Sequence, residues 1–362
     1  MWFYILVKDI QVSTKKEHNR HLLPFYEHPY FNRMPYIRPS LQRGMKERIA
    51  VIDLGTNTFH LFIVEVSKRE IKTLYREKIA VKIGKNGISK GRISADAKKR
   101  ALHTLQVFKT IIDQFEVKTV TGVATSAIRS AKNGQQLLDE IKEKTSIDIQ
   151  IISGDREAEL IFYGVKSTFH LTETPQLVMD IGGGSVEFII GNNEEIFWKQ
   201  SFEIGAQRLL DKFHKEDPIP QTSIEEMSAW LETELSSLVS AIEEFKPQGL
   251  IGCSGTFDTL SEIYMKENGI ERALDSLIFQ FPIKANNKIY EELITKNRKQ
   301  RMHIPGMVTM RVDMIVVASC LIQFVLKHMA TENITACAYA LKEGLLYTSF
   351  SHIKISEKSA SN

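Results

Sequence analysis

One short motif occurs twice in this chain of 362 residues. Aligned without gaps, segments 52–63 and 179–190 pair Asp53 with Asp180, Gly55 with Gly182, and Thr58 with Ser185, at an offset of 127 (179 minus 52). In both copies an apolar strand ends at the Asp, and a second strand follows the hydroxyl residue. The offset is much longer than the ~20 to 50 residues of a solenoid repeat. The sequence therefore predicts two domains of one architecture that face each other across a cleft.

The elements around the two copies follow the same order. Three strands (49–54, 58–66 and 71–83) precede a helix capped by Ser94, a strand at 117–124, a helix at 137–144, a strand at 147–153 and a helix from Asp155, its predicted N-cap. The second series has strands at 177–181, 186–190 and 195–202, a helix that opens with a Ser223/Glu226 capping box, and strands at 249–253 and 334–338. This order predicts α/β domains at 47–170 and 171–339. A last helix at about 340–352 is expected to pack back on the first domain.

The charge is unevenly distributed. Residues 1–46 carry eight Lys/Arg against three Asp/Glu, whereas the remaining chain has 39 against 41. The extension is interpreted as a flexible arm, an upstream extension or a start-site artefact, with a basic arm that contacts nucleic acid or a partner as the alternative. For the main body, no DNA partner is expected.

The cysteines and the apolar runs bear on location. Cys253, Cys320 and Cys337 are far apart and form no CxxC pair, which favours a reduced, cytoplasmic setting. The opening MWFYILV lacks the length and basic leader of a signal peptide, and the apolar run 314–326 is shorter than the ~20 residues of a membrane span. No membrane partner is expected.

Four short loops are candidate phosphate sites. An acid at a strand end, followed by a Gly/Asn/Thr turn, leaves backbone N–H groups free for an anion while the carboxylate holds its metal. One such loop alone could be a tight hairpin, but two facing copies argue against that reading. The third loop, 252–256, opens a helix after a strand, and the fourth places Thr125, Ser126 and Arg129 directly after another strand. The chain lacks both GxxxxGK[ST] and GxGxxG after a strand.

Glu157 and Arg129 each have an ordinary explanation. Glu157 lies in the first turn of a predicted helix, where the helix dipole favours a carboxylate. Its place at the domain junction would also allow it to accept a proton from an attacking water. Arg129 suits phosphate oxygens, although a surface salt bridge would explain it too.

Six segments together resemble one known family. IAVIDLGTNTFHLFIVEV, VATSAIR, IISGDREAELIFYGV, LVMDIGGGSVEFIIG, LIGCSGT and YALKEGLLY occur in the order and spacing of the Ppx/GppA family of exopolyphosphatases and guanosine pentaphosphate phosphatases. The resemblance runs from about Arg48 to Phe350. It implies two ribonuclease-H-like domains of the actin-like ATPase superfamily that flank an interdomain cleft.

The resemblance implies roles for individual residues. Glu157 is the expected general base, with Arg129 beside it. The phosphate-binding residues expected from the loops and the resemblance are Thr56, Asn57, Thr125, Ser126, Gly182, Gly183, Gly184, Ser185, Ser254, Gly255 and Thr256. Mg²⁺ is expected at Asp180 and Glu187, with Asp53 as a helper. The implied reaction is hydrolysis of the terminal phosphoanhydride of inorganic polyphosphate or guanosine pentaphosphate.

The chain also departs from the long members of that family. It ends at Asn362 without their C-terminal helical domain and its His-Asp dipeptide, as expected of a short form, and Arg311-Val-Asp313 replaces the commoner Arg-Ala-Asp. An ATPase or kinase of the same superfamily and a non-catalytic polyphosphate or alarmone sensor remain alternatives. The oligomeric state is left open, with a homodimer common among relatives.

Overall fold

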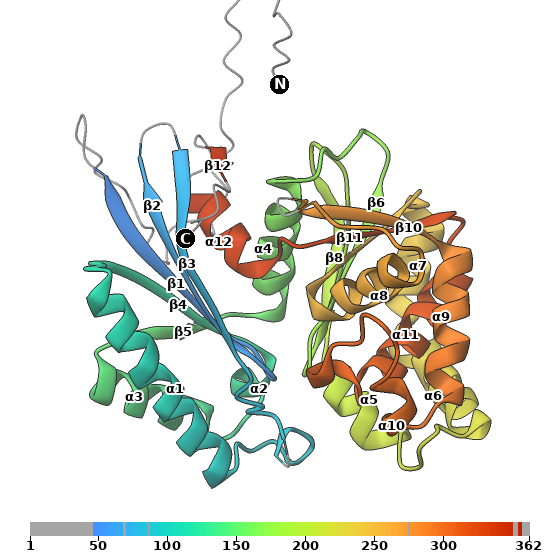
Figure 1. The fold of residues 1–362 in the computed structure, drawn as a ribbon, viewed down its shortest axis with the longest axis horizontal. Coiled ribbons are helices and arrows are strands. Elements are labelled where there is room, and N and C mark those ends of the chain that lie inside the picture. Colours follow the sequence, from blue (N-terminus) through green and yellow to red (C-terminus); the bar gives the residue numbers. More distant parts are fainter. Residues whose placement is uncertain (1–45, 68–69, 86, 274–275, 350–353, 357–362) are drawn as a thin grey trace, which may run out of the picture. The chain divides into compact units, whose positions relative to one another are not determined.

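The computed structural model describes residues 46–67, 70–85, 87–273, 276–349 and 354–356. The predicted extension 1–46 lies outside these ranges, apart from Lys46. The described residues form two six-stranded mixed sheets with helices, which confirms the α/β class (Figure 1).

The first sheet has the strand order β12-β3-β2-β1-β4-β5. Its strands are β1 (Glu47–Leu54), β2 (Phe59–Val66), β3 (Glu70–Ile79), β4 (Thr119–Ala124), β5 (Ile149–Ile151) and β12 (Lys354–Ser356). β2 is antiparallel to β1 and β3, whereas β4 runs parallel to β1 and to β5. Because β1 and β4 are parallel, the loops at their carboxyl ends lie at the same edge of the sheet.

The second sheet has the order β10-β11-β9-β6-β7-β8, in which five strands repeat the order β3-β2-β1-β4-β5 of the first sheet and β10 is added beside β11. Its strands are β6 (Gln176–Ile181), β7 (Val186–Gly191), β8 (Ile196–Phe202), β9 (Leu250–Cys253), β10 (Ile278–Pro282) and β11 (Asn333–Cys337). β6 pairs antiparallel with β7 and parallel with β9, as β1 does with β2 and β4. Both sheets thus share one architecture, as the repeated motif predicts.

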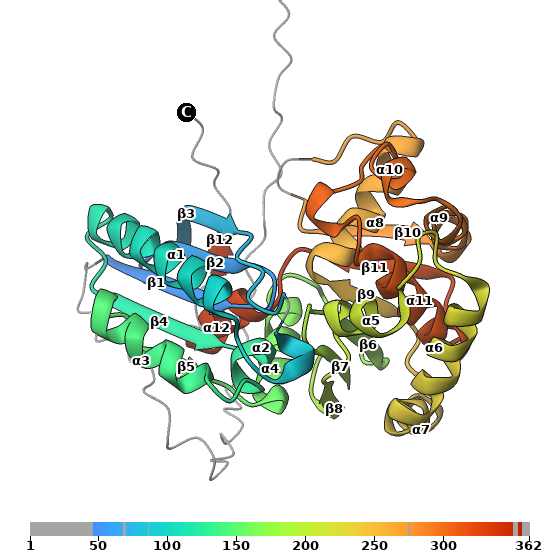
Figure 2. The same cartoon turned by 90° about the horizontal axis from the view of Figure 1, so that it is seen from below.

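Helices cover both faces of the first sheet (Figures 1 and 2). α1 (Ala95–Gln114) and α3 (Gly134–Thr145) pack on one face, and α4 (Gly154–Lys166) and α12 (Leu341–Ser349) pack together on the other. The short helices η2 (Ile88–Lys90) and α2 (Ser126–Arg129) lie in the connections. α12 also contacts β1, and β12 pairs with β3, so the end of the described chain packs on the first sheet. The domain boundaries at 47–170 and 171–339 stay a prediction.

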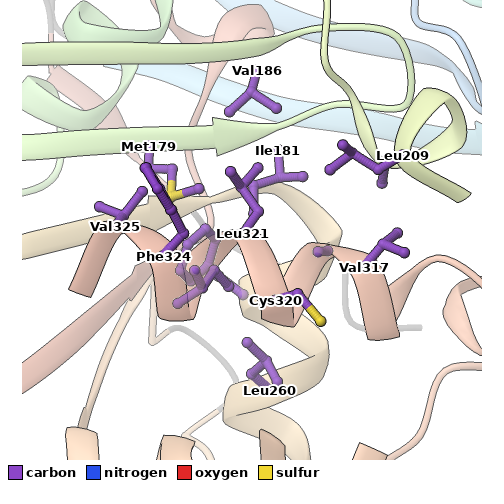
Figure 3. Packing of buried hydrophobic residues seen from close by; sticks show 14 of the residues in the cluster. Met179, Ile181, Val186, Leu209, Leu260, Val317, Cys320, Leu321, Phe324 and Val325 are labelled. Atoms are coloured by element: carbon purple, nitrogen blue, oxygen red, sulfur yellow. The ribbon is translucent and has the colours of Figure 1, made fainter. Parts of the chain in front are cut away.

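The second sheet is buried between α11 (Ile315–Lys327) and α4. Leu177, Met179 and Ile181 of β6 belong to the core that α11 completes (Figure 3), whereas the alternate residue Val178 packs in the cluster formed by α4. The apolar run at 314–326 is therefore a core helix, and no helix in the described ranges has the length and apolarity to span a bilayer. The other helices are α5 (Ala206–Phe213), α6 (Gln221–Glu234), α7 (Ser236–Phe245), α8 (Ser254–Glu267), α9 (Ile283–Thr295), α10 (Arg298–Arg301) and η3 (Thr309–Arg311).

Two predicted helix starts are wrong. The backbone is already helical at Gln221 after the extended Pro220, so Ser223 lies inside α6, and no side chain in the described ranges caps that helix. In α4 the N-cap is Ser153, whose Oγ accepts a hydrogen bond from the Arg156 N–H at 3.2 Å. Asp155 is therefore a residue of the first turn, as is Glu157. The Ser94 cap of α1 is confirmed, with its oxygen accepting from the Ala97 N–H.

Candidate active site

The two repeated loops lie directly against each other. A Cβ atom added to Gly183 would lie 2.3 Å from Asn57 Nδ2, and one added to Gly184 would lie 2.6 Å from Thr56 Oγ1. A Cβ on Gly205 would come within 2.5 Å of backbone atoms of both Gly183 and Gly184. Real Cβ atoms essentially never approach so closely, so the glycines are needed because two other chain segments pack over them.

The second loop has its peptide groups oriented by the start of α5. The carbonyl oxygens of Gly182 and Gly183 accept from the N–H groups of Ala206 and Gln207, both at 2.9 Å. Within the described ranges, the N–H groups of Gly183 and Gly184 donate to no other residue. Their donors are therefore available to an anion, as in other loops in which successive N–H groups converge.

A cavity of about 140 Å³ lies at the junction of the loops. The predicted site residues that line it are Asp53, Thr56, Asn57, Thr125, Glu157, Asp180, Gly182, Gly183, Gly184, Ser185, Glu187, Ser254 and Gly255. Three predicted residues do not line it. Thr256 is buried in α8, while Ser126 and Arg129 lie behind the wall of the cavity and bond to other side chains.

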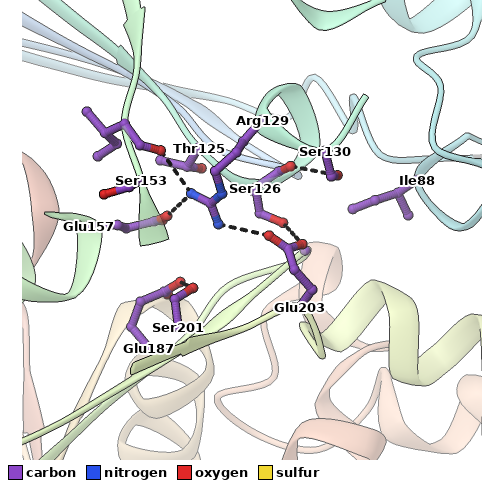
Figure 4. Close-up of polar contacts among 12 residues, drawn as sticks. Ile88, Thr125, Ser126, Arg129, Ser130, Ser153, Glu157, Glu187, Ser201 and Glu203 are labelled. Carbon is purple, nitrogen blue, oxygen red and sulfur yellow. Dashed lines mark hydrogen bonds and ion pairs between the residues drawn. The ribbon is translucent and has the colours of Figure 1, made fainter. Parts of the chain in front are cut away.

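Arg129 does not line the cavity itself, but it forms an ion pair with Glu157, which does (Figure 4). Its Nη1 donates to Glu157 Oε2 at 2.7 Å, and its Nη2 donates to Glu203 Oε1 at 2.9 Å. The other Glu203 oxygen accepts from Ser126 Oγ at 2.5 Å and from Arg208 at 2.8 Å. Burial raises the pKa of Glu157 to about 8, although Arg129 opposes that shift. Sequence reasoning identified both residues but missed Glu203, which joins the Arg to the end of β8.

Further buried carboxylates surround the cavity. Asp53 Oδ1 and Asp180 Oδ1 are buried and have no hydrogen-bond partner among the described residues, while Glu187 Oε1 accepts from Ser201 at 2.7 Å. Burial raises the pKa of Asp53 to about 7, and it also raises the pKa values of Asp180 and Glu187. Unsatisfied buried carboxyl oxygens of this kind are costly without a cation or a proton.

These carboxylates are suited to supply part of the coordination shell of Mg²⁺, with substrate phosphates and water supplying the remainder. No three His, Cys, Asp or Glu side chains among the described residues lie close enough together to hold an ion unaided. Mg²⁺ is usually bound through one or two carboxylates together with substrate phosphates and water. Asp53 Oδ1 and Asp180 Oδ1, which accept no hydrogen bond from any described residue, suit that mode of binding.

Three cations in the cavity wall were not recognised as site residues from sequence. Lys78, Arg311 and Lys342 come from β3, η3 and α12, respectively. Arg311 is 8% exposed, and its guanidinium lies so close to Gly255 that a Cβ there would meet Nη2 at 2.3 Å. In the described part of the chain, no residue forms a hydrogen bond or an ion pair with this guanidinium. The nearby carboxylates of Asp258 and Asp180 attract this positive charge, but the N–H donors of the guanidinium remain available to an anion. In the sequence, Arg311 stands out only as part of the Arg-Val-Asp segment that departs from the family pattern.

The sequence and the fold both resemble those of known proteins. Residues 62–352 match the model of the Ppx/GppA phosphatase family. The crystal structure of an exopolyphosphatase from Cytophaga hutchinsonii is 47% identical, with a TM-score of 0.82 over 85% of this chain and 99% of that one. Exopolyphosphatase 1 of Mycobacterium leprae is 26% identical over 83% of this chain and 88% of its own length. An Aquifex aeolicus Ppx/GppA structure, 22% identical over 85% of this chain and 98% of that one, shares the fold with a TM-score of 0.71. This chain belongs to the Ppx/GppA phosphatase family.

Proposed function

We propose that the protein is a magnesium-dependent exopolyphosphatase that removes the terminal phosphate of inorganic polyphosphate. The observation that carries this proposal is the position of Glu157. Its carboxylate is buried from solvent, is held by Arg129 and lines the cavity between the two repeated loops. A general base needs such a fixed position beside the bound phosphate, within reach of a water. The names of the relatives support polyphosphate as the substrate.

Each part of the cavity has a chemical task in this proposal. The free N–H groups of Gly183 and Gly184 bind oxygens of the terminal phosphate, and Thr56 with Asn57 contacts it from the first loop. Glu157 removes a proton from the attacking water. The new P–O bond forms as the bond to the next phosphate breaks, and Arg311 stabilises charge on the leaving chain. Mg²⁺ bound through Asp180, Glu187 or Asp53 would supply further stabilisation of that charge.

The cavity linings favour polyphosphate over a guanosine nucleotide. A second cavity, which shares the lining residue Asn57, adjoins this one. Among the described residues that line the two cavities, there is no Phe, Tyr or Trp on which a guanine base could stack. Guanosine pentaphosphate therefore stays a second prediction, to be tested in the same assay.

The decisive test is phosphate release by the full chain with Mg²⁺, measured in parallel on polyphosphate, guanosine pentaphosphate and ATP. We expect polyphosphate to be cleaved with the highest kcat/KM, and a chelator to abolish turnover. Turnover of ATP alone would replace the proposal with an ATPase or kinase. Binding of polyphosphate without turnover of any substrate would identify a sensor.

The activity is also expected to depend on pH. Because the pKa of Glu157 is raised to about 8 by burial, the base is protonated at lower pH and becomes active as the pH rises. We expect kcat/KM to increase with pH up to about 8 and then to level off. Arg129→Met should shift this rise of kcat/KM to higher pH, because Arg129 lowers the pKa of Glu157. An unchanged pH profile in Arg129→Met would contradict the coupling between these two residues.

A further inference from the structure

A second cavity of about 460 Å³ lies beside the first one. Asn57 lines both cavities, and its Nδ2 donates to Met314 Sδ in the wall of the second at 3.1 Å. The second cavity is lined by Lys82, Lys85 and Lys90, none of which lines the first. These three residues are called the lysine rim.

The lysine rim is attached to the first glycine loop. The Lys82 N–H donates to the Asn57 carbonyl at 2.8 Å, and the Gly84 N–H donates to the Thr56 carbonyl at 3.1 Å. A Cβ on Gly84 would meet Thr56 Cγ2 at 2.6 Å, so the two segments are in close contact. The rim therefore has a defined place relative to the predicted cleavage site.

The lysine rim contributes positive charge to the lining of the second cavity. In the described ranges none of the three ammonium groups has an ion-pair partner. The cavity also contains two carboxylates, of which Asp313 is paired with a cation, whereas Asp211 is hydrogen-bonded to neutral side chains and keeps its charge. Asp211 accepts from Ser89 and Gln207, while Asp313 pairs with Arg298 at 2.8 Å. With Asp313 neutralised by Arg298, the three lysines and Asp211 leave this lining a net charge of +2 (three minus one), which favours an anionic ligand.

The first cavity is too small for a chain of phosphates. Its volume of about 140 Å³ is small beside the ~300 to 1,000 Å³ of pockets that enclose a drug-sized ligand, so it accommodates the terminal groups only. The remainder of a long substrate must leave along a neighbouring surface. Lysine ammonium groups bind phosphate as flexible point charges, which suits a chain without fixed conformation.

We infer that the lysine rim binds the distal phosphates of a polyphosphate chain whose terminal phosphate lies in the first cavity. This inference rests on the proposed function, because it assigns the position of that substrate. It also explains how one site would distinguish long chains from short ones. Long chains would contact all three lysines, whereas tripolyphosphate, with only two phosphates beyond the terminal one, would contact fewer of them.

The test compares long-chain polyphosphate with tripolyphosphate in the triple variant Lys82→Gln/Lys85→Gln/Lys90→Gln. We expect KM for the long chain to rise about tenfold, since three exposed charge contacts are lost, while kcat/KM for tripolyphosphate stays within about twofold. A matched control is Lys99→Gln/Lys118→Gln/Lys144→Gln, which removes the same charge from exposed lysines that line neither cavity. It should leave both substrates unaffected.

Equal changes for the two substrates, or no change for the long chain, would overturn the assignment of the rim. Direct binding of long-chain polyphosphate to both triple variants gives a second readout that needs no turnover. Weaker binding by the rim variant alone supports the subsite even if the wild-type protein releases no phosphate. In that case the proposed hydrolase would fail while the rim assignment would stand. Equal binding by both variants would reject it.

Discussion

Glu157→Gln is expected to lower phosphate release by about 10²- to 10⁴-fold while leaving polyphosphate binding within about threefold. The amide keeps the size of the side chain but cannot accept a proton from the attacking water. The phosphate-binding N–H groups and Arg311 are separate from this residue, so affinity should persist. Single-turnover phosphate release and equilibrium binding would measure the two quantities.

The same helix offers a matched control. Glu159 follows Glu157 by two residues in α4, and its Oε2 accepts from Arg156 at 2.8 Å outside the cavity. Glu159→Gln should therefore keep nearly full activity. Substantial release by Glu157→Gln, at a rate near that of Glu159→Gln, would exclude Glu157 as the base. A different water-activating group would then be required.

The strand pairs and one helix cap could be predicted from the sequence because residues close to one another in the chain determine them. The repeated Asp-x-Gly turn marks the same strand pair in each sheet, and the Ser94 cap depends on an N–H only three residues away. The wrong capping box in α6 shows the limit of such signals. Ser223 and Glu226 have the correct spacing, but helical backbone is already present at Gln221. A favourable motif therefore does not exclude an earlier start.

The parts of the site that sequence did not reveal depend on contacts between distant segments. Glu203 and Ser126 are 77 positions apart, and neither stands in a motif that indicates the other. Arg311 becomes a site residue only because η3 brings it against Gly255 at the start of α8. Such positions follow from tertiary packing, whereas the glycine loops carry a pattern that can be recognised locally.

Gly205 is the sharpest test of the packing around the glycine loop. Its φ of −56° is accessible to any residue, so alanine there would bring no backbone strain. The obstacle is steric, since the added Cβ would lie 2.4 Å from the Gly184 nitrogen and 2.5 Å from the Gly183 carbonyl carbon. These are backbone atoms, which cannot rotate away as a side chain can.

Gly205→Ala should therefore displace the loop that presents the free N–H groups. We expect about a 10²-fold loss of kcat/KM, since a misplacement near 1 Å has that effect, and a loss of about 1–3 kcal/mol in unfolding free energy. Gly269→Ala provides the comparison, because its φ of +64° brings backbone strain while no atom lies within 4 Å of the new Cβ. Chemical denaturation and phosphate release would measure both variants. If Gly205→Ala retained wild-type activity, close packing over the three glycines would not be what positions the phosphate, and the loop would have to tolerate movement.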